Sequence, residues 1–95
     1  MGQSPIIKMW YTYILQSKKD GKYYIGSTGD LERRIKRHNS GGNISTKNRR
    51  PLEIIYYEIY NTNSEALSRE KEIKSWKGGI KFKKLIMRSP ANGVK

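Results

Sequence analysis

Two short tyrosine motifs and the basic run that follows them contain side chains suited to phosphate chemistry. The motifs read Tyr11-Thr12-Tyr13 and Tyr24-Ile25-Gly26, and the basic run extends from Leu31 to His38. Two tyrosines, an arginine and a histidine thereby come within one predicted hairpin and one predicted helix. Such a set of groups can act on a phosphodiester.

The basic run predicts a helix with a reactive edge. At 100° per residue, Leu31 and Ile35 form a buried stripe, and Arg34 and His38, spaced i,i+4, lie along one edge of it. A guanidinium at the margin of a core is held rigidly, and its planar fork suits the oxygens of a phosphate. The alternative is that these basic residues form an exposed, DNA-attracting face, which we expect for Arg33 and Lys36, with Arg37 lying between that face and the edge.

A carboxylate stands out on the second predicted helix. Glu70 falls within the apolar arc, close in angle to Ile73, whereas Glu65 and Glu72 face solvent. Burying an unpaired carboxylate costs several kcal/mol, so Glu70 needs a cation or strong donors. One interpretation is an ion pair with a neighbouring Lys or Arg. The other is a cleft where Glu70 holds a divalent metal, because one carboxylate with waters and substrate oxygens is a normal Mg²⁺ arrangement. The other members of the predicted buried face are Ala66, Leu67 and Lys77.

Six of the seven tyrosines fall into two groups. Tyr13 and Tyr24 are candidates for chemistry because of their neighbours. Gly26 ends the strand that leads to the basic helix, and we expect it to let a phosphate approach the backbone closely. The remaining strand tyrosines are interpreted as packing residues: Tyr11, Tyr23, Tyr56 and Tyr57.

Three strands and three helices position these groups. Aromatic and β-branched runs predict strands over Trp10 to Leu15, Lys22 to Ser27 and Leu52 to Tyr60, and Lys18 to Gly21 carries hairpin chemistry. Apolar residues fall on both parities of the third strand, so we expect helices on both faces of the sheet.

Helix signals complete the predicted fold. We expect the first helix to start near Thr28, its N-cap, and to run to about Asn39. A capping box at Thr62 predicts a second helix that runs to about Lys77. A shorter third helix is predicted over Ile80 to Met87. The order β-β-α-β-α-α predicts an α+β fold, a three-stranded antiparallel sheet flanked by three helices. We expect one domain over residues 9–87, with flexible segments at 1–8 and 88–95.

Composition favours a nucleic-acid partner. The 95 residues carry a formal net charge of +12, which attracts polyanions through long-range forces and counterion release. The absence of cysteine excludes disulfides and thiolate metal sites, and the single histidine excludes a multi-histidine site. No apolar run can cross a bilayer and no signal peptide is visible, so we expect no membrane partner and a cytoplasmic location. The residues predicted to contact nucleic acid, mostly in or beside the polar loop from Asn39 to Arg50, are Arg37, Lys47, Arg49, Arg50, Lys81 and Lys83.

These residues resemble the GIY-YIG nuclease superfamily from Met9 to about Leu85, and its small single-domain members most closely. Tyr24-Ile25-Gly26 is the YIG element unaltered, and Tyr11-Thr12-Tyr13 stands where the family has GIY, so only Tyr13 is carried over. The resemblance places Arg34 at the catalytic arginine, His38 at a histidine found in several members, and Glu70 at the metal-binding glutamate. Where many members have a phosphate-contacting asparagine, this chain has lysines in the segment from Gly79 to Lys84.

The resemblance implies a DNA endonuclease dependent on Mg²⁺ or Mn²⁺, acting in DNA repair or recombination, with RNA as a further possible substrate. Its catalytic residues are then Tyr13, Tyr24, Arg34, His38 and Glu70, with Glu70 as metal ligand. Two alternatives remain open: a non-catalytic nucleic-acid-binding module of the same fold, and an adaptor that recruits a partner protein.

Overall fold

The computed structural model describes residues 8–44 and 46–87 of the chain. Its elements follow the order β1 (Trp10–Ser17), β2 (Tyr23–Thr28), α1 (Leu31–Asn39), a 3-10 turn (Lys47–Arg49), β3 (Leu52–Tyr60), α2 (Asn63–Trp76) and α3 (Ile80–Met87). The sheet is antiparallel with strand order β2-β1-β3. The predicted α+β fold is therefore confirmed, although β1 runs two residues further than expected. Apart from Lys8, the segments predicted to be flexible, 1–8 and 88–95, lie outside the described residues.

Strand β1 is the centre of the fold, because it pairs with both other strands and alternates its side chains between two cores. Tyr13 and Leu15 pack into the cluster on one face, whereas Ile14 packs into the cluster on the other. Thr12, which shares a face with Ile14, donates from its buried hydroxyl to the carbonyl oxygen of Ala66 at 2.8 Å. This bond attaches α2 directly to the central strand.

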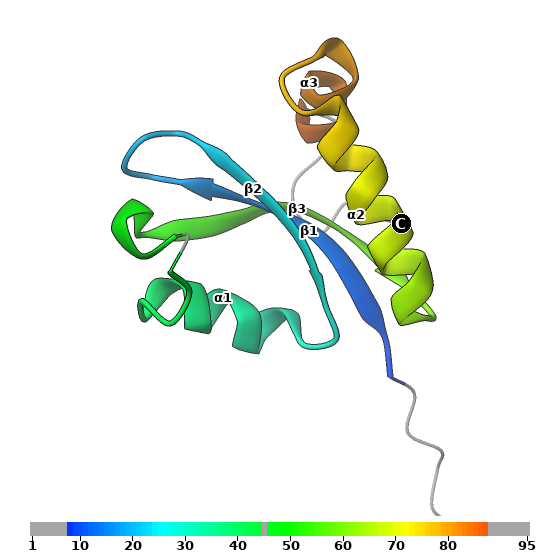
Figure 1. The fold of residues 1–95 in the computed structure, drawn as a ribbon, viewed down its shortest axis with the longest axis horizontal. Helices are drawn as coiled ribbons and strands as arrows, with labels where there is room; N and C mark the ends of the chain where they lie inside the picture. The colour runs from blue at the N-terminus through cyan, green and yellow to red at the C-terminus, as the bar shows by residue number, and fades with distance from the viewer. Residues whose placement is uncertain (1–7, 45, 88–95) are drawn as a thin grey trace, which may run out of the picture.

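Helices cover both faces of the sheet, as predicted (Figure 1). Helix α1 lies on the face of Tyr13 and Leu15, and its Leu31 and Ile35 pack against their cluster. The predicted N-cap, Thr28, is wrong. Thr28 pairs with Tyr11 as the last residue of β2, and Asp30 caps α1 by accepting a hydrogen bond from the backbone N–H of Arg33 at 3.0 Å.

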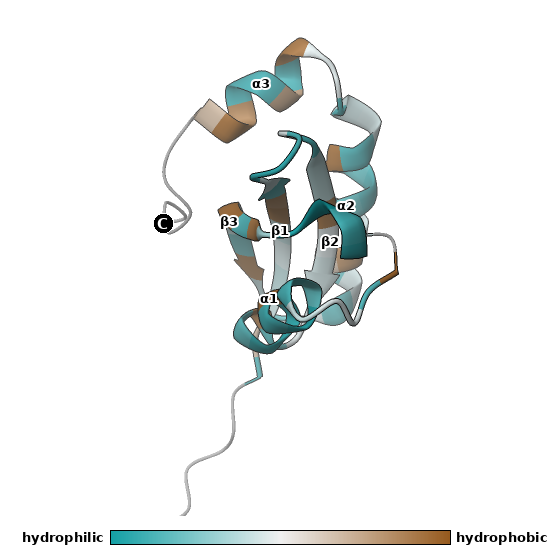
Figure 2. Ribbon diagram, turned by 90° about the vertical axis from the view of Figure 1, so that its left-hand side faces the viewer, coloured by the Kyte–Doolittle hydropathy of each residue, from teal (hydrophilic) through white to brown (hydrophobic). Residues whose placement is uncertain are grey.

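Helices α2 and α3 cover the opposite face. The predicted capping box is confirmed, since Thr62 accepts from the Glu65 backbone N–H and Glu65 accepts from that of Thr62. Ala66 and Ile73 are buried as expected, but Leu67 is 42% exposed, so its assignment to the buried face was wrong. Helix α2 lies over β2 and β1, and only a narrow arc of it reaches the core. Figure 2 shows α1 and much of α2 as hydrophilic, and no helix in the described ranges is long and apolar enough to span a membrane.

Strand β3 contributes to both cores because its pairing with β1 shifts register. Ile14 lies opposite Tyr56 while Leu15 lies opposite Ile54, which leaves Ile55 as an extra residue. Ile55 and Tyr56 consequently pack against the same cluster, although they are consecutive. This irregularity explains the apolar residues on both parities of the strand.

A buried ionic network fastens α2 to β3. The Arg69 guanidinium donates to both carboxylate oxygens of Glu58 at 2.8 and 2.9 Å, and the hydroxyls of Tyr56 and Tyr60 donate to the same carboxylate. Burial tends to raise the pKa of Glu58, but these hydrogen bonds outweigh it, and the pKa lies below its usual value. The network fixes the helix that carries Glu70.

Candidate active site

A hollow of about 340 Å³ beside β2 collects side chains from four elements and one loop. The five predicted catalytic residues all line it, coming from β1, β2, α1 and α2. The structure thus brings Tyr13, Tyr24, Arg34, His38 and Glu70 together. The other lining residues are Ile25, Gly26, Asn43, Thr46, Lys74 and Lys77.

Arg34 and Tyr13 form the inner wall of the hollow. The Arg34 Nη1 donates to the Tyr13 hydroxyl oxygen at 3.3 Å, and Tyr13 is only 3% exposed. Burial raises the pKa of Tyr13, although Arg34 works in the opposite direction. Tyr13 therefore keeps its proton at neutral pH, and its hydroxyl remains a donor toward the hollow.

Gly26 has a packing role in addition to the one expected. It pairs with Tyr13 across the hairpin, and a Cβ at Gly26 would lie 2.5 Å from the Tyr13 hydroxyl oxygen and 2.7 Å from Cζ. The phenol of Tyr13 thus occupies the position of the missing side chain, and the approach of a phosphate to the Gly26 backbone stays a prediction. The missing side chain at Gly26 lets Tyr13 lie across β2 and meet Arg34.

Glu70 points into the hollow from α2, and its side chain is 16% exposed. The Ser27 hydroxyl donates to Oε1 at 2.7 Å, and the Lys74 ammonium lies 2.8 Å from Oε2. The ion-pair interpretation of Glu70 thus describes the contacts in this structure. Within residues 8–44 and 46–87, no three His, Cys, Asp or Glu side chains are grouped so as to hold a metal ion. Among such side chains, Glu70 is the carboxylate that lines the hollow, so it is the residue that could hold a metal there with waters and substrate oxygens.

His38 is almost fully buried, at 5% exposed, at the end of α1. Its Nδ1 is hydrogen-bonded to the Thr46 hydroxyl at 2.8 Å. Its Nε2 is buried and has no hydrogen-bond partner in the part of the chain that the structure describes. Burial, followed by the charges of Arg34 and Arg37, lowers the pKa of His38, so the ring is neutral at neutral pH. A buried, unpartnered nitrogen beside the hollow is suited to a substrate oxygen or a water.

Tyr24 lies at the outer wall, next to a fixed cation. The Lys77 ammonium lies 5.7 Å from the centroid of the Tyr24 ring and donates to the backbone carbonyl of Tyr23 at 2.6 Å. Tyr24 is half-buried and packs against the cluster on the α1 side. Its ring is therefore held at the boundary between the core and the hollow.

The residues predicted to contact nucleic acid lie elsewhere, and none is among the described residues that line the hollow. Arg49 is paired with Asp20 at 3.3 Å, so this guanidinium already has an anionic partner. The Arg50 Nε donates to the carbonyl of Lys47 at 2.7 Å. The exposed members of the set are Arg37, Lys47, Arg50, Lys81 and Lys83, and their contact with nucleic acid stays a prediction.

Sequence reasoning did not assign Ser27, Lys74 or Thr46 to this site. Lys74 follows Glu70 by four residues, a spacing that places an acid and a base side by side on a helix and could have identified it. Ser27 and Thr46 reach the site only through the docking of α2 on β2 and of the loop on α1. Neither position carries a signal in the sequence.

Comparison with known families agrees with this arrangement. The model of the GIY-YIG catalytic domain matches residues 9–84, which include every element from β1 to α3 except the last residues of α3. The chain belongs to the GIY-YIG family. This is a nuclease family, and its domain implies a nucleic-acid substrate.

Relatives of similar size are found among UPF0213 proteins. A UPF0213 protein of Staphylococcus saprophyticus is 47% identical over 74 residues, covering 77% of this chain and 89% of that protein. A UPF0213 protein of Haloquadratum walsbyi is 45% identical over 67 residues, covering 70% and 74% of the two chains. The solution structure of a UPF0213 protein from Bacillus halodurans superposes with a TM-score of 0.56 at 35% identity, covering 86% of each chain. The chain is therefore similar to small UPF0213 proteins over most of their length.

Proposed function

We propose that this protein is a metal-dependent endonuclease that hydrolyses phosphodiester bonds of DNA, with a role in repair or recombination. One observation carries the proposal: a guanidinium, a shielded carboxylate and two phenols line the same hollow. They belong to Arg34, Glu70, Tyr13 and Tyr24. The hydrogen bond between Arg34 and Tyr13 orients donor groups toward the hollow. The Nε2 atom of His38 has no hydrogen-bond partner among the described residues. A module that only binds nucleic acid does not need this arrangement.

Glu70 suits a divalent metal such as Mg²⁺ or Mn²⁺. Mg²⁺ is usually held by one or two carboxylates together with waters and substrate phosphates, so one carboxylate is enough. The two groups now on Glu70, a serine hydroxyl and a half-exposed lysine, can both move aside. When bound, the metal would act as a Lewis acid that stabilises charge on the leaving oxygen.

Arg34 is the group that would hold the phosphate. Its other N–H donors are available to the non-bridging oxygens, because within the described residues the guanidinium makes one hydrogen bond, from Nη1 to the Tyr13 hydroxyl. Fixed donors of this kind stabilise the negative charge that grows in the transition state without having to reorganise. Tyr13 thereby orients Arg34 and offers its own proton to the same site.

The attacking water would lie near Tyr24 and His38. Tyr24 would accept a proton from the water or orient it, and neutral His38 would accept a hydrogen bond at Nε2 or act as a proton shuttle, since its lowered pKa leaves the ring uncharged at neutral pH. DNA would be attracted by the net charge of +12 and contacted at its backbone by Arg37, Lys47, Arg50, Lys81 and Lys83. Arg49 belongs to this set in the sequence-based prediction, and its pairing with Asp20 makes it the weakest member.

The role of Arg34 can be tested by Arg34→Lys, with Arg33→Lys as a matched control on the same helix. Both variants keep the charge, but only the first removes the fork from the hollow. We expect Arg34→Lys to lower the rate of plasmid nicking by about a hundredfold, and Arg33→Lys to leave it within about threefold of wild type. DNA affinity, measured by fluorescence anisotropy, should change equally little in both. Equal nicking rates for the two variants would show that Arg34 contributes only charge.

A further inference from the structure

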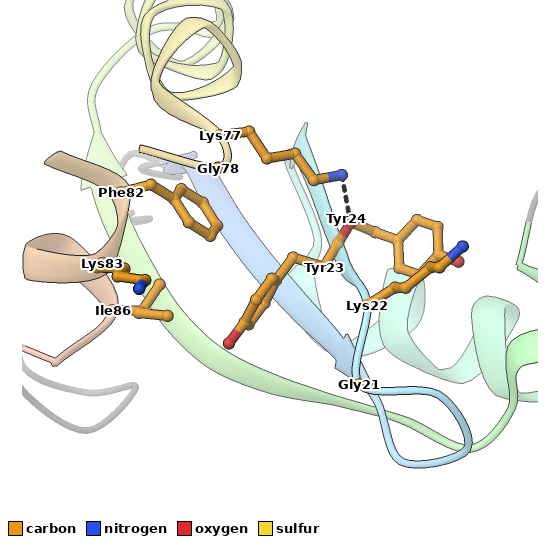
Figure 3. Close-up of a pocket in the computed structure, with 9 residues that line it drawn as sticks. All are labelled: Gly21, Lys22, Tyr23, Tyr24, Lys77, Gly78, Phe82, Lys83 and Ile86. Atoms are coloured by element: carbon orange, nitrogen blue, oxygen red, sulfur yellow. Dashed lines mark hydrogen bonds between the residues drawn. The ribbon is translucent and has the colours of Figure 1, made fainter. Parts of the chain in front are cut away.

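A second cavity, of about 430 Å³, lies next to the hollow, between the start of β2 and helix α3 (Figure 3). It shares two lining residues with the hollow, Tyr24 and Lys77. The two spaces are thus neighbours along the edge of the sheet formed by β2. Tyr23 and Tyr24 follow each other on that strand, so their rings point to opposite sides, and Figure 3 shows the Tyr23 ring directed toward the side of Phe82 and Ile86.

The walls of this cavity are aromatic and apolar. The rings of Tyr23 and Phe82 meet edge to face, with centroids 5.2 Å apart at an interplanar angle of 72°. Phe82 is 2% exposed and belongs to the core, so this wall is rigid. Ile86 on the next turn of α3 extends the apolar surface. A flat apolar ligand would be shielded from water on this wall.

The rim of the cavity is positively charged. Lys22, Lys77 and Lys83 line it, and none of the described lining residues is acidic. Lys77 is held in place by its 2.6 Å bond to the Tyr23 carbonyl oxygen, beside the Tyr24 ring. An apolar, aromatic interior with a cationic rim is complementary to a nucleotide, whose base is flat and whose phosphate is negative.

We propose that this cavity receives an unpaired base of the DNA strand whose phosphate occupies the neighbouring hollow. The proposal rests on the function proposed above and specifies its substrate. A base in a duplex is stacked and paired, and it can enter such a cavity only after leaving the helix. The preferred substrate is therefore a strand with at least one unpaired nucleotide next to the cleaved bond: single-stranded, frayed or extruded DNA.

Binding without metal tests the proposal separately from cleavage. In EDTA, fluorescence anisotropy would compare three labelled ligands of equal length: oligothymidylate, an abasic deoxyribose-phosphate chain and a blunt duplex. We expect the wild type to bind oligothymidylate about tenfold more tightly than the abasic chain, because stacking adds affinity at equal charge. Tyr23→Leu should lose most of that difference and bind the duplex as wild type does.

Tyr11→Leu is the matched control, since Tyr11 is a partly exposed tyrosine of the neighbouring strand that packs against Tyr57 and lines neither space. Tyr11→Leu should keep the full difference in affinity between oligothymidylate and the abasic chain. Circular dichroism would show whether both variants fold. Equal wild-type affinity for oligothymidylate and the abasic chain would overturn the proposal, as would equal losses in the two variants. A protein that discriminates bases in EDTA but never cleaves DNA with Mg²⁺ would refute the nuclease and leave the base-binding cavity in place.

Discussion

Lys74 is predicted to compete with the metal for Glu70. Its ammonium lies 2.8 Å from Oε2, and the two residues are one helical turn apart on α2. A cation that binds Glu70 has to displace Lys74 and then remain close to a like charge. Replacing Lys74 with methionine keeps most of the aliphatic side chain and removes the charge, so we expect Lys74→Met to bind the metal more tightly.

The size of this effect follows from the exposure of the pair. The Lys74 side chain is 54% exposed and that of Glu70 is 16% exposed, so solvent screens the charge of Lys74 more than the charge of Glu70. An exposed i,i+4 ion pair on a helix contributes about 0.3–0.5 kcal/mol of interaction free energy. Because Glu70 is shielded from solvent, we expect about 0.5–1 kcal/mol for its pair with Lys74. Since about 1.4 kcal/mol corresponds to a tenfold change, the Kd for the metal should fall about two- to fivefold.

Binding of Mn²⁺ to the protein without DNA, followed by electron paramagnetic resonance of the free ion, measures this Kd directly. Lys71→Met is the control, because Lys71 is an exposed lysine of the same helix that points roughly 100° away from Glu70. We expect Lys71→Met to change the Kd much less. The reasoning fails if Lys74→Met leaves the Kd unchanged, or if Lys71→Met lowers it as much, since the effect would then come from overall charge.

Two further predictions concern the support of the site. Gly26→Ala should destabilise the fold by about 1–3 kcal/mol in urea denaturation and abolish nicking, because the new Cβ would lie 2.5 Å from the Tyr13 hydroxyl oxygen; unchanged stability would mean that Tyr13 is not held against Gly26. Glu58→Gln should cost about 2 kcal/mol at pH 7. Because the pKa of Glu58 is lowered in the folded state, its contribution is present above the unfolded value of about 4.3 and is lost as pH falls through the lower folded value. The difference between wild type and Glu58→Gln should therefore shrink in urea titrations at acid pH, and a difference independent of pH would contradict the role of this carboxylate.

Local sequence patterns predicted most of the fold, and pairing between distant segments accounts for what they missed. Strand β3 was expected over Leu52 to Tyr60 and has those bounds, because β-branched and aromatic residues mark it throughout. The extra residue at Ile55 depends on the partner strand and has no local signal. Thr28 and Asp30 are both acceptable N-caps, and only the pairing of Thr28 with Tyr11 leaves the cap to Asp30.

The site shows the same division. Glu70 was identified because a carboxylate within an apolar arc demands a partner, and Arg34 and His38 because of their shared helix edge. Ser27, whose hydroxyl donates to Glu70, and Thr46, whose hydroxyl is hydrogen-bonded to His38 Nδ1, come from segments placed by tertiary packing. Leu67 was misplaced because the width of the buried arc on α2 depends on how the helix docks over β2 and β1.

Plasmid nicking by Glu70→Gln tests the central claim most directly. Glutamine keeps an acceptor for the Ser27 hydroxyl and removes the charge that a metal requires. We expect the wild type to nick supercoiled plasmid with Mg²⁺ and not in EDTA, and Glu70→Gln to be slower by at least about a hundredfold while melting and binding DNA as the wild type does. Nicking by Glu70→Gln at the wild-type rate with Mg²⁺ would show that the carboxylate in the hollow takes no part in hydrolysis.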